Sequence, residues 1–325
     1  MSYVLEVKGL TTRFQSKKES ITVVDRVDFK LNEGEVLGIV GESGCGKSVT
    51  SLSILQLLGK NGKSQGEILY KNNNLLDQSE KELRRIRGSE ISMIFQDPMN
   101  SLNPLLTIGK QIGEIIQKHE NIRGEKLKNK VVDLLEKVGI SRSSNIFHEY
   151  PHRLSGGMKQ RVMIAMAIAC NPAILIADEP TTALDVTIQA QILDLLKILK
   201  DSLNMSILLI THDLGVVAEI CDRVVVMYAG QVVEMTDTRT LLRKPRHPYT
   251  IGLIQSTPQQ SKGRSRLKSI SGQVPTPDQF PVGCRFADRC SSALDICYSD
   301  EPPLLELEPT TFCKCWLYQS MEEVI

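Results

Sequence analysis

The sequence lacks any apolar run long enough to cross a lipid bilayer. Its longer apolar stretches, such as Val162 to Cys170, fall well short of the ~18–20 residues that a spanning helix needs. The first residues, Met1 to Glu6, have no basic region followed by an apolar run, so we expect no export signal. A cytoplasmic chain is therefore expected, and any association with a membrane would come through partner subunits.

The sequence also lacks an excess of charge of either sign. Its 39 Lys and Arg residues balance 38 Asp and Glu residues, which leaves a formal net charge of +1. Non-specific binding of nucleic acid needs a broad positive field, so we expect no nucleic-acid partner. The contents of 41% hydrophobic and 24% charged residues are ordinary for a globular protein. The length of 325 residues predicts one large domain with a smaller appendage.

Cysteine is scarce up to residue 283, where only three of the eight occur. The other five crowd into the C-terminal tail, at Cys284, Cys290, Cys297, Cys313 and Cys315. Because disulfides are disfavoured in a reducing compartment, this clustering indicates a metal or cluster site in the tail.

The spacing of apolar residues predicts an α/β protein. Short β-rich segments come first, at Tyr3–Val7, Thr22–Phe29 and Glu35–Val40, and a glycine-rich turn then leads into a helix from about Lys47 to Leu58. Further strands are expected at 66–70, 90–95, 173–177, 205–210, 223–227 and 231–234. Helical spacing between Thr107 and Val138, closed by Gly139, predicts a helical insertion within about residues 100–170.

The end of the chain differs in composition from the rest. Short helices are expected at 239–243 and 248–254, and the compact core is expected to end near Pro258. Residues 259–271 are polar and basic and are followed by Pro275, Pro277 and Pro281, which is typical of a linker. The sequence thus predicts a core at 1–258, and a linker with a cysteine-rich module at 259–325.

The run from Gly41 to Ser48, Gly-Glu-Ser-Gly-Cys-Gly-Lys-Ser, matches the phosphate-binding pattern G-x-x-x-x-G-K-[ST]. It lies where an apolar strand meets a helix, which is the context that this pattern requires. The glycines let backbone N–H groups converge on phosphate oxygens at the helix N-terminus. We expect Lys47 to reach the β- and γ-phosphates of a bound nucleotide and Ser48 to bind Mg²⁺.

A second motif places two carboxylates at the end of a buried strand, in the run Ala173-Ile-Leu-Ile-Ala-Asp178-Glu179. The carboxyl edge of a parallel sheet is where such residues meet a bound nucleotide. We expect Asp178 to hold Mg²⁺, commonly through water. Glu179 is the better candidate to polarise the attacking water, because a metal-bound carboxylate is a poor base.

Between these two motifs, the run Leu154-Ser155-Gly156-Gly157-Met158-Lys159-Gln160 opens an apolar-rich helix. It resembles the signature motif of ABC ATPases, and the three motifs together, in this order and spacing, are highly specific. The resemblance covers residues 1 to about 320. It implies a P-loop ABC ATPase core with a β-rich N-terminal subdomain, a helical insertion and a small C-terminal cysteine-rich module.

The resemblance also implies roles for single residues. Gln96, in Phe95-Gln-Asp-Pro, would sense Mg²⁺ and the attacking water, and His212 would contact the γ-phosphate. Phe14 would stack on adenine. The turn from Ala183 to Asp185 follows the carboxylates. Nucleotide contacts besides Lys47 and Ser48 would come from Gly41, Ser43, Gly44, Cys45, Gly46 and Val49.

The family works as a head-to-tail dimer, which implies partners for this chain. Ser155 and Gly157 would bind the γ-phosphate held by the phosphate loop of a second ATPase subunit, expected to be a paralogue. Closure of the dimer on ATP would pass through the helical insertion and the Gln96 loop to two membrane permease subunits. An extracytoplasmic peptide-binding protein would act indirectly.

Two further runs narrow the resemblance to the ATPases of oligopeptide, dipeptide and nickel importers. These are the segment from Phe95 to Pro104, and Arg246-His-Pro-Tyr-Thr250 followed by Leu253 to Pro258. The match favours peptides as cargo, and nickel or another small solute remains the alternative. A soluble ABC ATPase is a further alternative, although the single set of motifs, the missing heptad run and the balanced charge argue against it. A redox sensor with a secondary ATPase ranks last.

The tail resembles the peptide-importer tail that carries a [4Fe–4S] cluster in several members. This implies Cys284, Cys290, Cys297 and Cys315 as ligands, with Cys313 as the alternative fourth ligand. The family's frequent His four residues before the last cysteine is Thr311 here. Zinc and uncoordinated thiols remain open alternatives. For Cys45, a helix N-terminus would lower the thiol pKa and favour inhibitory modification, and the alternative is a small residue that fills the loop.

Overall fold

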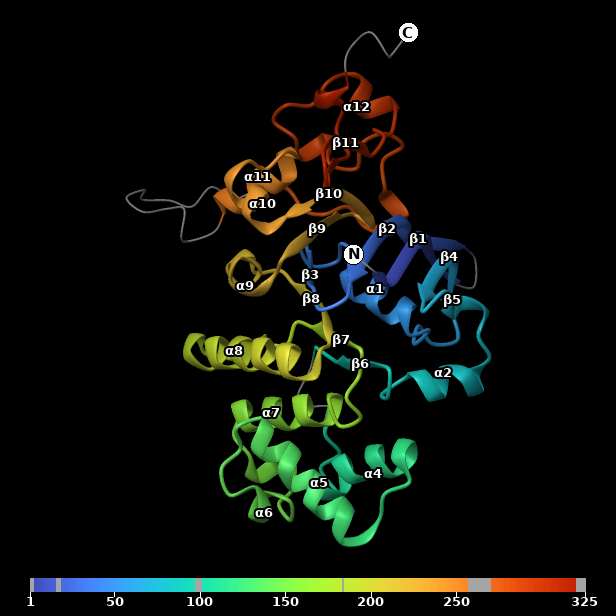
Figure 1. The fold of residues 1–325 in the computed structure, drawn as a ribbon. Helices are drawn as coiled ribbons and strands as arrows, with labels where there is room; N and C mark the ends of the chain where they lie inside the picture. Colours follow the sequence, from blue (N-terminus) through green and yellow to red (C-terminus); the bar gives the residue numbers. More distant parts are fainter. Residues whose placement is uncertain (1–2, 16–18, 97–100, 183, 257–269, 320–325) are drawn as a thin grey trace. The chain divides into compact units, whose positions relative to one another are not determined.

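The computed structural model describes residues 3–15, 19–96, 101–182, 184–256 and 270–319 (Figure 1). The chain divides into two compact units. Unit 1 comprises residues 1–4, 32–35 and 77–209, and unit 2 comprises residues 5–31, 36–76 and 210–325. None of the helices in the described residues is long and apolar enough to cross a membrane.

Unit 1 contains part of a parallel sheet and most of the helices that follow it in the chain. The strand order is β8-β7-β6, and β6 and β7 are parallel with Ile91 opposite Ile174. The elements are α2 (Glu80–Ile86), β6 (Ile91–Ile94), α4 (Ile108–Glu120), α5 (Gly124–Lys137), α6 (Ser143–Ile146), α7 (Gly156–Ala167), β7 (Ile174–Asp178), α8 (Val186–Leu203) and β8 (Ser206–Thr211), the last two residues of which belong to unit 2.

The predicted helical insertion is confirmed as the group α4 to α7, drawn in green in Figure 1. Val131, Leu134 and Leu135 form the buried face of α5, as their helical spacing predicts. The helix ends at Lys137 because Gly139 adopts a positive φ of 74°, a conformation that glycine reaches without strain. Two predicted site segments, the start of α7 and the end of β7, therefore lie on well-packed elements of this unit.

Unit 2 contains the remaining strands in two groups, ordered β2-β1-β4-β5 and β11-β12-β10-β9-β3. In the second group β3 and β9 are parallel, with Ile39 opposite Val225. The elements are β1 (Tyr3–Gln15), β2 (Ser20–Asn32), β3 (Val36–Val40), α1 (Lys47–Ile54), β4 (Gly62–Tyr70), β5 (Asn73–Asn74), α9 (Leu214–Ile220), β9 (Arg223–Tyr228), β10 (Gln231–Asp237), α10 (Thr238–Arg243), α11 (Pro248–Gln255), α12 (Ile296–Ser299), β11 (Leu305–Glu308) and β12 (Thr311–Cys313).

Helix α1 is shorter than the sequence predicts, because it ends at Ile54 rather than near Leu58. Gln56 adopts a positive φ of 50°, and the backbone N–H of Leu57 donates to the carbonyl oxygen of Leu52. This is the hydrogen-bond pattern that closes many helices, here with a glutamine where glycine is usual.

The cysteine-rich tail contains two strands that the sequence reading did not predict. Strand β12 pairs antiparallel with β10, with Cys313 opposite Glu234, and β11 pairs with β12. The tail, drawn in red in Figure 1, therefore extends the β9–β10 hairpin within unit 2. The predicted linker at 259–271 falls almost entirely on residues 257–269, which lie outside the described part of the chain.

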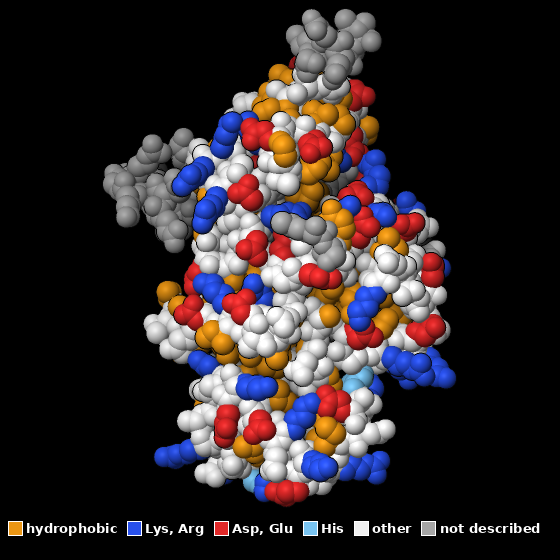
Figure 2. All heavy atoms as spheres, in the orientation of Figure 1, with side chains coloured by type: hydrophobic (Ala, Val, Ile, Leu, Met, Phe, Trp, Pro, Cys, Tyr) orange, Lys and Arg blue, Asp and Glu red, His pale blue; other side chains and the backbone are white. Residues whose placement is uncertain are grey.

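Acidic and basic side chains are interspersed over the face drawn in Figure 2. This mixture agrees with the formal net charge of +1.

Candidate functional site

The phosphate loop in unit 2 joins the fully buried strand β3 to the start of α1. At Gly41, a Cβ atom would lie 2.2 Å from the carbonyl oxygen of Met227 and 2.7 Å from Cys45 Sγ, so no other residue fits. At Gly46, the residue before the helix, φ is +102°, which again suits glycine. These two positions explain physically why the pattern requires glycine where this sequence has it.

Lys47 is the first residue of α1, and its side chain turns back over the loop. Its Nζ donates hydrogen bonds to the carbonyl oxygens of Gly41 at 2.7 Å and Glu42 at 3.1 Å. The residue is only 5% exposed, so its charge is concentrated inside the loop. A buried ammonium at a helix N-terminus can attract and orient a phosphate group.

The expected lowering of the Cys45 thiol pKa is wrong. Cys45 is completely buried, and burial raises its pKa because the thiolate loses its hydration, an effect larger than the attraction of Lys47. The thiol lies within 3.8 Å of Lys47 Nζ. Cys45 is therefore a small buried residue of the loop, as the alternative interpretation has it.

Unit 2 also contains Phe14 and His212, which the sequence assigned to nucleotide contacts. Phe14 lies near the end of β1 opposite Gly62, and a Cβ atom at Gly62 would come within 3.1 Å of the Phe14 ring. His212 is exposed and follows β8 directly. The next residue, Asp213, caps α9 by accepting the backbone N–H of Gly215 at 2.7 Å.

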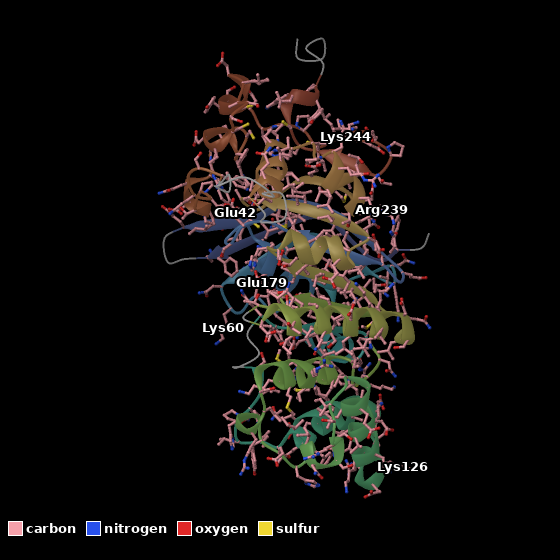
Figure 3. All side chains as sticks on the ribbon, turned by 90° about the vertical axis from the view of Figure 1, so that its left-hand side faces the viewer. Glu42, Lys60, Lys126, Glu179, Arg239 and Lys244 are labelled. Carbon is pink, nitrogen blue, oxygen red and sulfur yellow. The ribbon has the colours of Figure 1, made fainter. Side chains whose placement is uncertain are left out.

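In unit 1 the structure brings together two of the predicted catalytic residues. Gln96 Nε2 donates to Glu179 Oε2 at 3.0 Å, and Thr182 Oγ1 donates to the same oxygen at 2.9 Å. Glu179 (labelled in Figure 3) has a positive φ of 48°, an uncommon conformation for a non-glycine residue that often marks functional sites. Asp178, the last residue of β7, is buried at 4% exposure.

The signature segment forms the N-terminus of α7. Ser155 caps the helix by accepting the backbone N–H of Met158 at 3.3 Å. A side chain at Gly157 would meet Ile188 at 3.1 Å, so glycine leaves room for close packing there. Parts of the neighbouring motifs, namely Asp97 to Asn100, Ala183 and Pro258, lie outside the described residues.

Four cysteines of the tail share one local feature, which is a backbone N–H donated to the sulfur. Ser292 N–H donates to Cys290 Sγ and Leu294 N–H to Cys297 Sγ, each at 3.4 Å. The backbone N–H groups of Phe286 and Leu317 act likewise on Cys284 and Cys315. Hydrogen bonds to sulfur are one of the means by which proteins tune bound iron–sulfur clusters.

Cys313 differs from these four, because it is a residue of β12 and lies opposite Glu234. Its thiol is completely buried, and burial together with the Glu234 carboxylate raises its pKa far above the usual range. Burial also raises the pKa of Cys284 to about 11 and that of Cys315 to about 12. Within the described residues, no group of three or more His, Cys, Asp or Glu side chains could hold a metal ion. The cluster therefore stays a prediction.

Sequence reasoning missed two residues that hold the site together. Thr182 supports Glu179, and the sequence signal was its position three residues further on, where its hydroxyl can reach back. Glu42 occupies a position that the phosphate-loop pattern leaves unspecified, yet its polar groups are held by residues far along the chain. No local signal indicates those partners.

Comparison with known proteins identifies two families along the chain. The family "ABC transporter" matches residues 24–182, and the family "Oligopeptide/dipeptide transporter, C-terminal region" matches residues 233–297. Among similar proteins, the oligopeptide transport ATP-binding protein AppD of Bacillus subtilis is 53% identical over 98% of this chain and 98% of its own length. The oligopeptide transport ATP-binding protein OppD of the same organism is 50% identical over 97% of this chain and 88% of its own.

Solved structures agree with this assignment. The ATP-binding cassette MJ0796, in a dimeric post-hydrolysis state bound to ADP and Pi, covers 72% of this chain and 99% of its own, with 30% identity and a TM-score of 0.64. CbiO1 from Clostridium perfringens, part of the ABC transporter complex cbiONQ, covers 76% of this chain and 97% of its own, with 28% identity and a TM-score of 0.63. The chain belongs to the ABC transporter family of ATP-binding proteins, in the group with an oligopeptide/dipeptide transporter C-terminal region.

Proposed function

We propose that this chain is the ATP-hydrolysing subunit of an ABC importer for dipeptides or oligopeptides, located at the cytoplasmic face of the membrane. The observation that carries this proposal is its 53% identity, over nearly the full length of both chains, to an oligopeptide transport ATP-binding protein. The match of the C-terminal region to the oligopeptide/dipeptide transporter family supports the same cargo.

In the proposed mechanism the phosphate loop binds the nucleotide. Backbone N–H groups from Gly41 to Val49, which include those of Ser43, Gly44 and Gly46, surround the phosphates, and Lys47 exchanges its loop carbonyl partners for phosphate oxygens. Phe14 offers a ring face to the adenine, and His212 contacts the γ-phosphate. These roles rest on the family motifs and on the loop geometry described above.

Mg²⁺ fits the donor set of hydroxyl, carboxylate and amide oxygens supplied by Ser48, Asp178 and Gln96. When bound, the ion would neutralise charge on the phosphates. Glu179 takes the part of general base for the attacking water. The hydrogen bonds that Gln96 and Thr182 donate to one oxygen of Glu179 orient its carboxylate for accepting the proton of the water.

The proposed assembly is a head-to-tail pair of ATPase subunits that acts on two membrane permease subunits. Ser155 and Gly157 at the start of α7 would complete the site of the second subunit, where the helix N-terminus favours the negative γ-phosphate. A peptide-binding protein outside the membrane would deliver the cargo. The core at 1–258 and the tail module at 259–325 are proposed as the functional divisions of the chain.

We further propose that the tail carries a [4Fe–4S] cluster on Cys284, Cys290, Cys297 and Cys315. Four sulfurs that accept backbone N–H groups suit such a cluster in donor chemistry. Cys315 fits better than Cys313 as the fourth ligand, because its sulfur accepts a backbone N–H as the other three do, whereas Cys313 is a buried strand residue.

Transport in proteoliposomes that contain the complete importer tests the cargo. We expect ATP-dependent accumulation of a radiolabelled tetrapeptide, which the Glu179→Gln variant abolishes. Uptake of ⁶³Ni²⁺ with no peptide uptake would instead establish the alternative cargo.

Anaerobic purification followed by iron and sulfide analysis tests the cluster. We expect about four irons and four sulfides per chain, as the cluster composition requires, with loss of iron in Cys315→Ser and retention in Cys313→Ser. Stoichiometric zinc, or no metal at all, would contradict the cluster and leave the ATPase proposal untouched.

A further inference from the structure

Glu42, the second residue of the phosphate loop, is held through three of its polar groups. Its carboxylate accepts two hydrogen bonds from the Arg289 guanidinium, from Nη1 at 2.8 Å and from Nη2 at 3.0 Å. Its backbone N–H donates to Tyr249 Oη at 2.8 Å, and its carbonyl oxygen accepts from Lys47 Nζ at 3.1 Å. All four residues belong to unit 2, and Glu42 is labelled in Figure 3.

Arg289 comes from the cysteine-rich tail, where it directly precedes Cys290. Its side chain is only 6% exposed, and its Nε donates to the carbonyl oxygen of Ser271 at 2.8 Å. Nη1 also lies 3.3 Å from Tyr228 Oη, and the guanidinium carbon lies 5.6 Å from the centroid of that ring. The planar guanidinium group of Arg289 is therefore held by several partners at once. A lysine ammonium could not reproduce this arrangement.

Tyr249 reaches the loop from α11 and is completely buried. Its ring packs 4.7 Å from that of Tyr228 and 5.4 Å from that of Phe286, measured between centroids. Phe286 lies in the tail between Cys284 and Cys290, so the aromatic cluster of Tyr228, Tyr249 and Phe286 connects the tail rigidly to the loop. Arg289 and Tyr249 thus both hold the same loop residue.

We propose that Arg289 and Tyr249 are positioning residues that hold the phosphate loop in the conformation that receives ATP. The Arg289 side chain neutralises the Glu42 carboxylate, which otherwise places a negative charge in a loop that must bind phosphates. An unpaired Glu42 carboxylate would also compete with phosphate for Lys47. A loop held in its binding conformation binds ATP without first losing conformational entropy.

The tail therefore has a function in nucleotide binding, independent of the cargo and of any metal that its cysteines hold. This goes beyond the proposed transport function, since it assigns the C-terminal region a part in the ATP site of the same chain. It also predicts that disturbance of the tail around Arg289 weakens ATP binding, even though the tail contains none of the ATP-binding motifs.

The test measures the Kd for MgATP of the full chain by titration calorimetry, and KM and kcat of the assembled importer. For Arg289→Met we expect Kd and KM to rise about tenfold, a typical coupling between contacting groups, while kcat changes less than about twofold. Adding Glu42→Gln to Arg289→Met should recover most of the loss, because the uncompensated charge is then removed. Kd and KM of Arg289→Lys should lie between those of the wild type and Arg289→Met, because lysine keeps the charge but loses one of the two hydrogen bonds to Glu42.

Lys314→Met is the matched control. Lys314 flanks a cysteine of the same tail, as Arg289 does, and its partly buried ammonium pairs with Glu301, which is also a tail residue. We expect it to leave Kd and KM unchanged. Equal effects of Lys314→Met and Arg289→Met on Kd would overturn the proposal, and so would additive effects of Glu42→Gln and Arg289→Met.

Tyr249→Phe tests the same positioning role if Arg289→Met does not fold. It retains the buried ring and removes only the hydroxyl that accepts the Glu42 N–H. An increase of KM for ATP with an unchanged unfolding temperature supports the positioning role. Unchanged Kd and KM in this variant, together with unchanged values in Arg289→Lys, would contradict it.

Discussion

Glu179 is the residue on which the proposed hydrolysis depends most directly. Its carboxylate is oriented by Gln96 and Thr182, at 3.0 and 2.9 Å. The amide of Glu179→Gln cannot accept a proton from water, so we expect kcat to fall by about 10²- to 10⁴-fold, the usual contribution of a general base. ATP binding should persist, and size-exclusion chromatography with ATP should reveal a trapped closed dimer.

Glu125→Gln provides a control for Glu179→Gln in the same unit. Glu125 is exposed in the first turn of α5, so the same change from acid to amide should leave kcat as it is. Rapid hydrolysis by Glu179→Gln would show that another group acts as the base.

The buried His247 side chain makes the free energy of unfolding depend on pH. It is completely buried at the start of α11, where its Nδ1 accepts the backbone N–H of Tyr249 at 3.0 Å, and burial lowers its pKa from 6.5 to about 3. Below pH 6.5 the unfolded chain therefore binds a proton at His247, whereas His247 stays neutral in the folded chain until the pH approaches 3. The stabilisation from neutral His247 is complete above pH 6.5 and is lost progressively as the pH falls toward 3.

His247→Asn removes the titrating group and retains an acceptor for the helix cap. Relative to this variant, the free energy of unfolding of the wild type should fall by up to about 1.4 kcal/mol between pH 6.5 and 5.5, measured by urea unfolding. Parallel curves for the two proteins across this range would contradict the buried neutral histidine. Glu234, which accepts the backbone N–H of His247, is present in both the wild type and His247→Asn, so its contribution to the pH dependence cancels.

At the scale of elements, the pairing of β12 with β10 attaches the tail to the rest of unit 2. Thr236 and Thr311 share a buried hydrogen bond between their hydroxyls at 2.8 Å. Thr311→Val would leave the Thr236 hydroxyl buried without this partner, which should cost about 1–3 kcal/mol of unfolding free energy. The double variant Thr236→Val/Thr311→Val should regain most of this loss, because neither hydroxyl is then buried.

Denaturant unfolding of Thr236→Val, Thr311→Val and the double variant measures the coupling between the two threonines. Thr187→Val, the same change at an exposed position of α8, is the control. A double variant less stable than Thr311→Val alone would show that the hydroxyl pair is not the stabilising feature.

The elements of the core were predictable because their apolar residues follow the period of the structure they form. Strand β7 is an unbroken apolar run that is buried throughout, and α5 buries the face that its spacing predicts. Strand β11 also alternates in polarity, with Leu305 and Leu307 each followed by a glutamate, but the cysteines around this segment indicate a metal site rather than a strand. The pairing of the next strand, β12, could not be found from the local pattern, since β12 pairs with β10 about 75 residues earlier.

For the whole molecule, ligand binding should be visible as increased thermal stability. MgATP at about a hundred times its Kd should add about 2.7 kcal/mol by mass action and raise the unfolding temperature by several degrees. Lys47→Ala removes the buried ammonium of the phosphate loop and should abolish this shift, as measured by differential scanning fluorimetry. Ser101→Ala, outside the phosphate loop, should retain it. A shift of equal size in Lys47→Ala would show that ATP binds elsewhere.

The sequence by itself determined the phosphate loop, the strand that ends in Asp178 and Glu179, the signature segment and the family. These signals are local: each depends on a strand, a turn and a helix that are adjacent in the chain, so their residue types reflect nearby backbone geometry. Only the tertiary structure decided that Cys45 is buried with a raised pKa and that Cys313 is a strand residue. It alone pairs Glu42 with Arg289 across 247 residues, because burial and long-range ion pairs arise only when distant segments pack together.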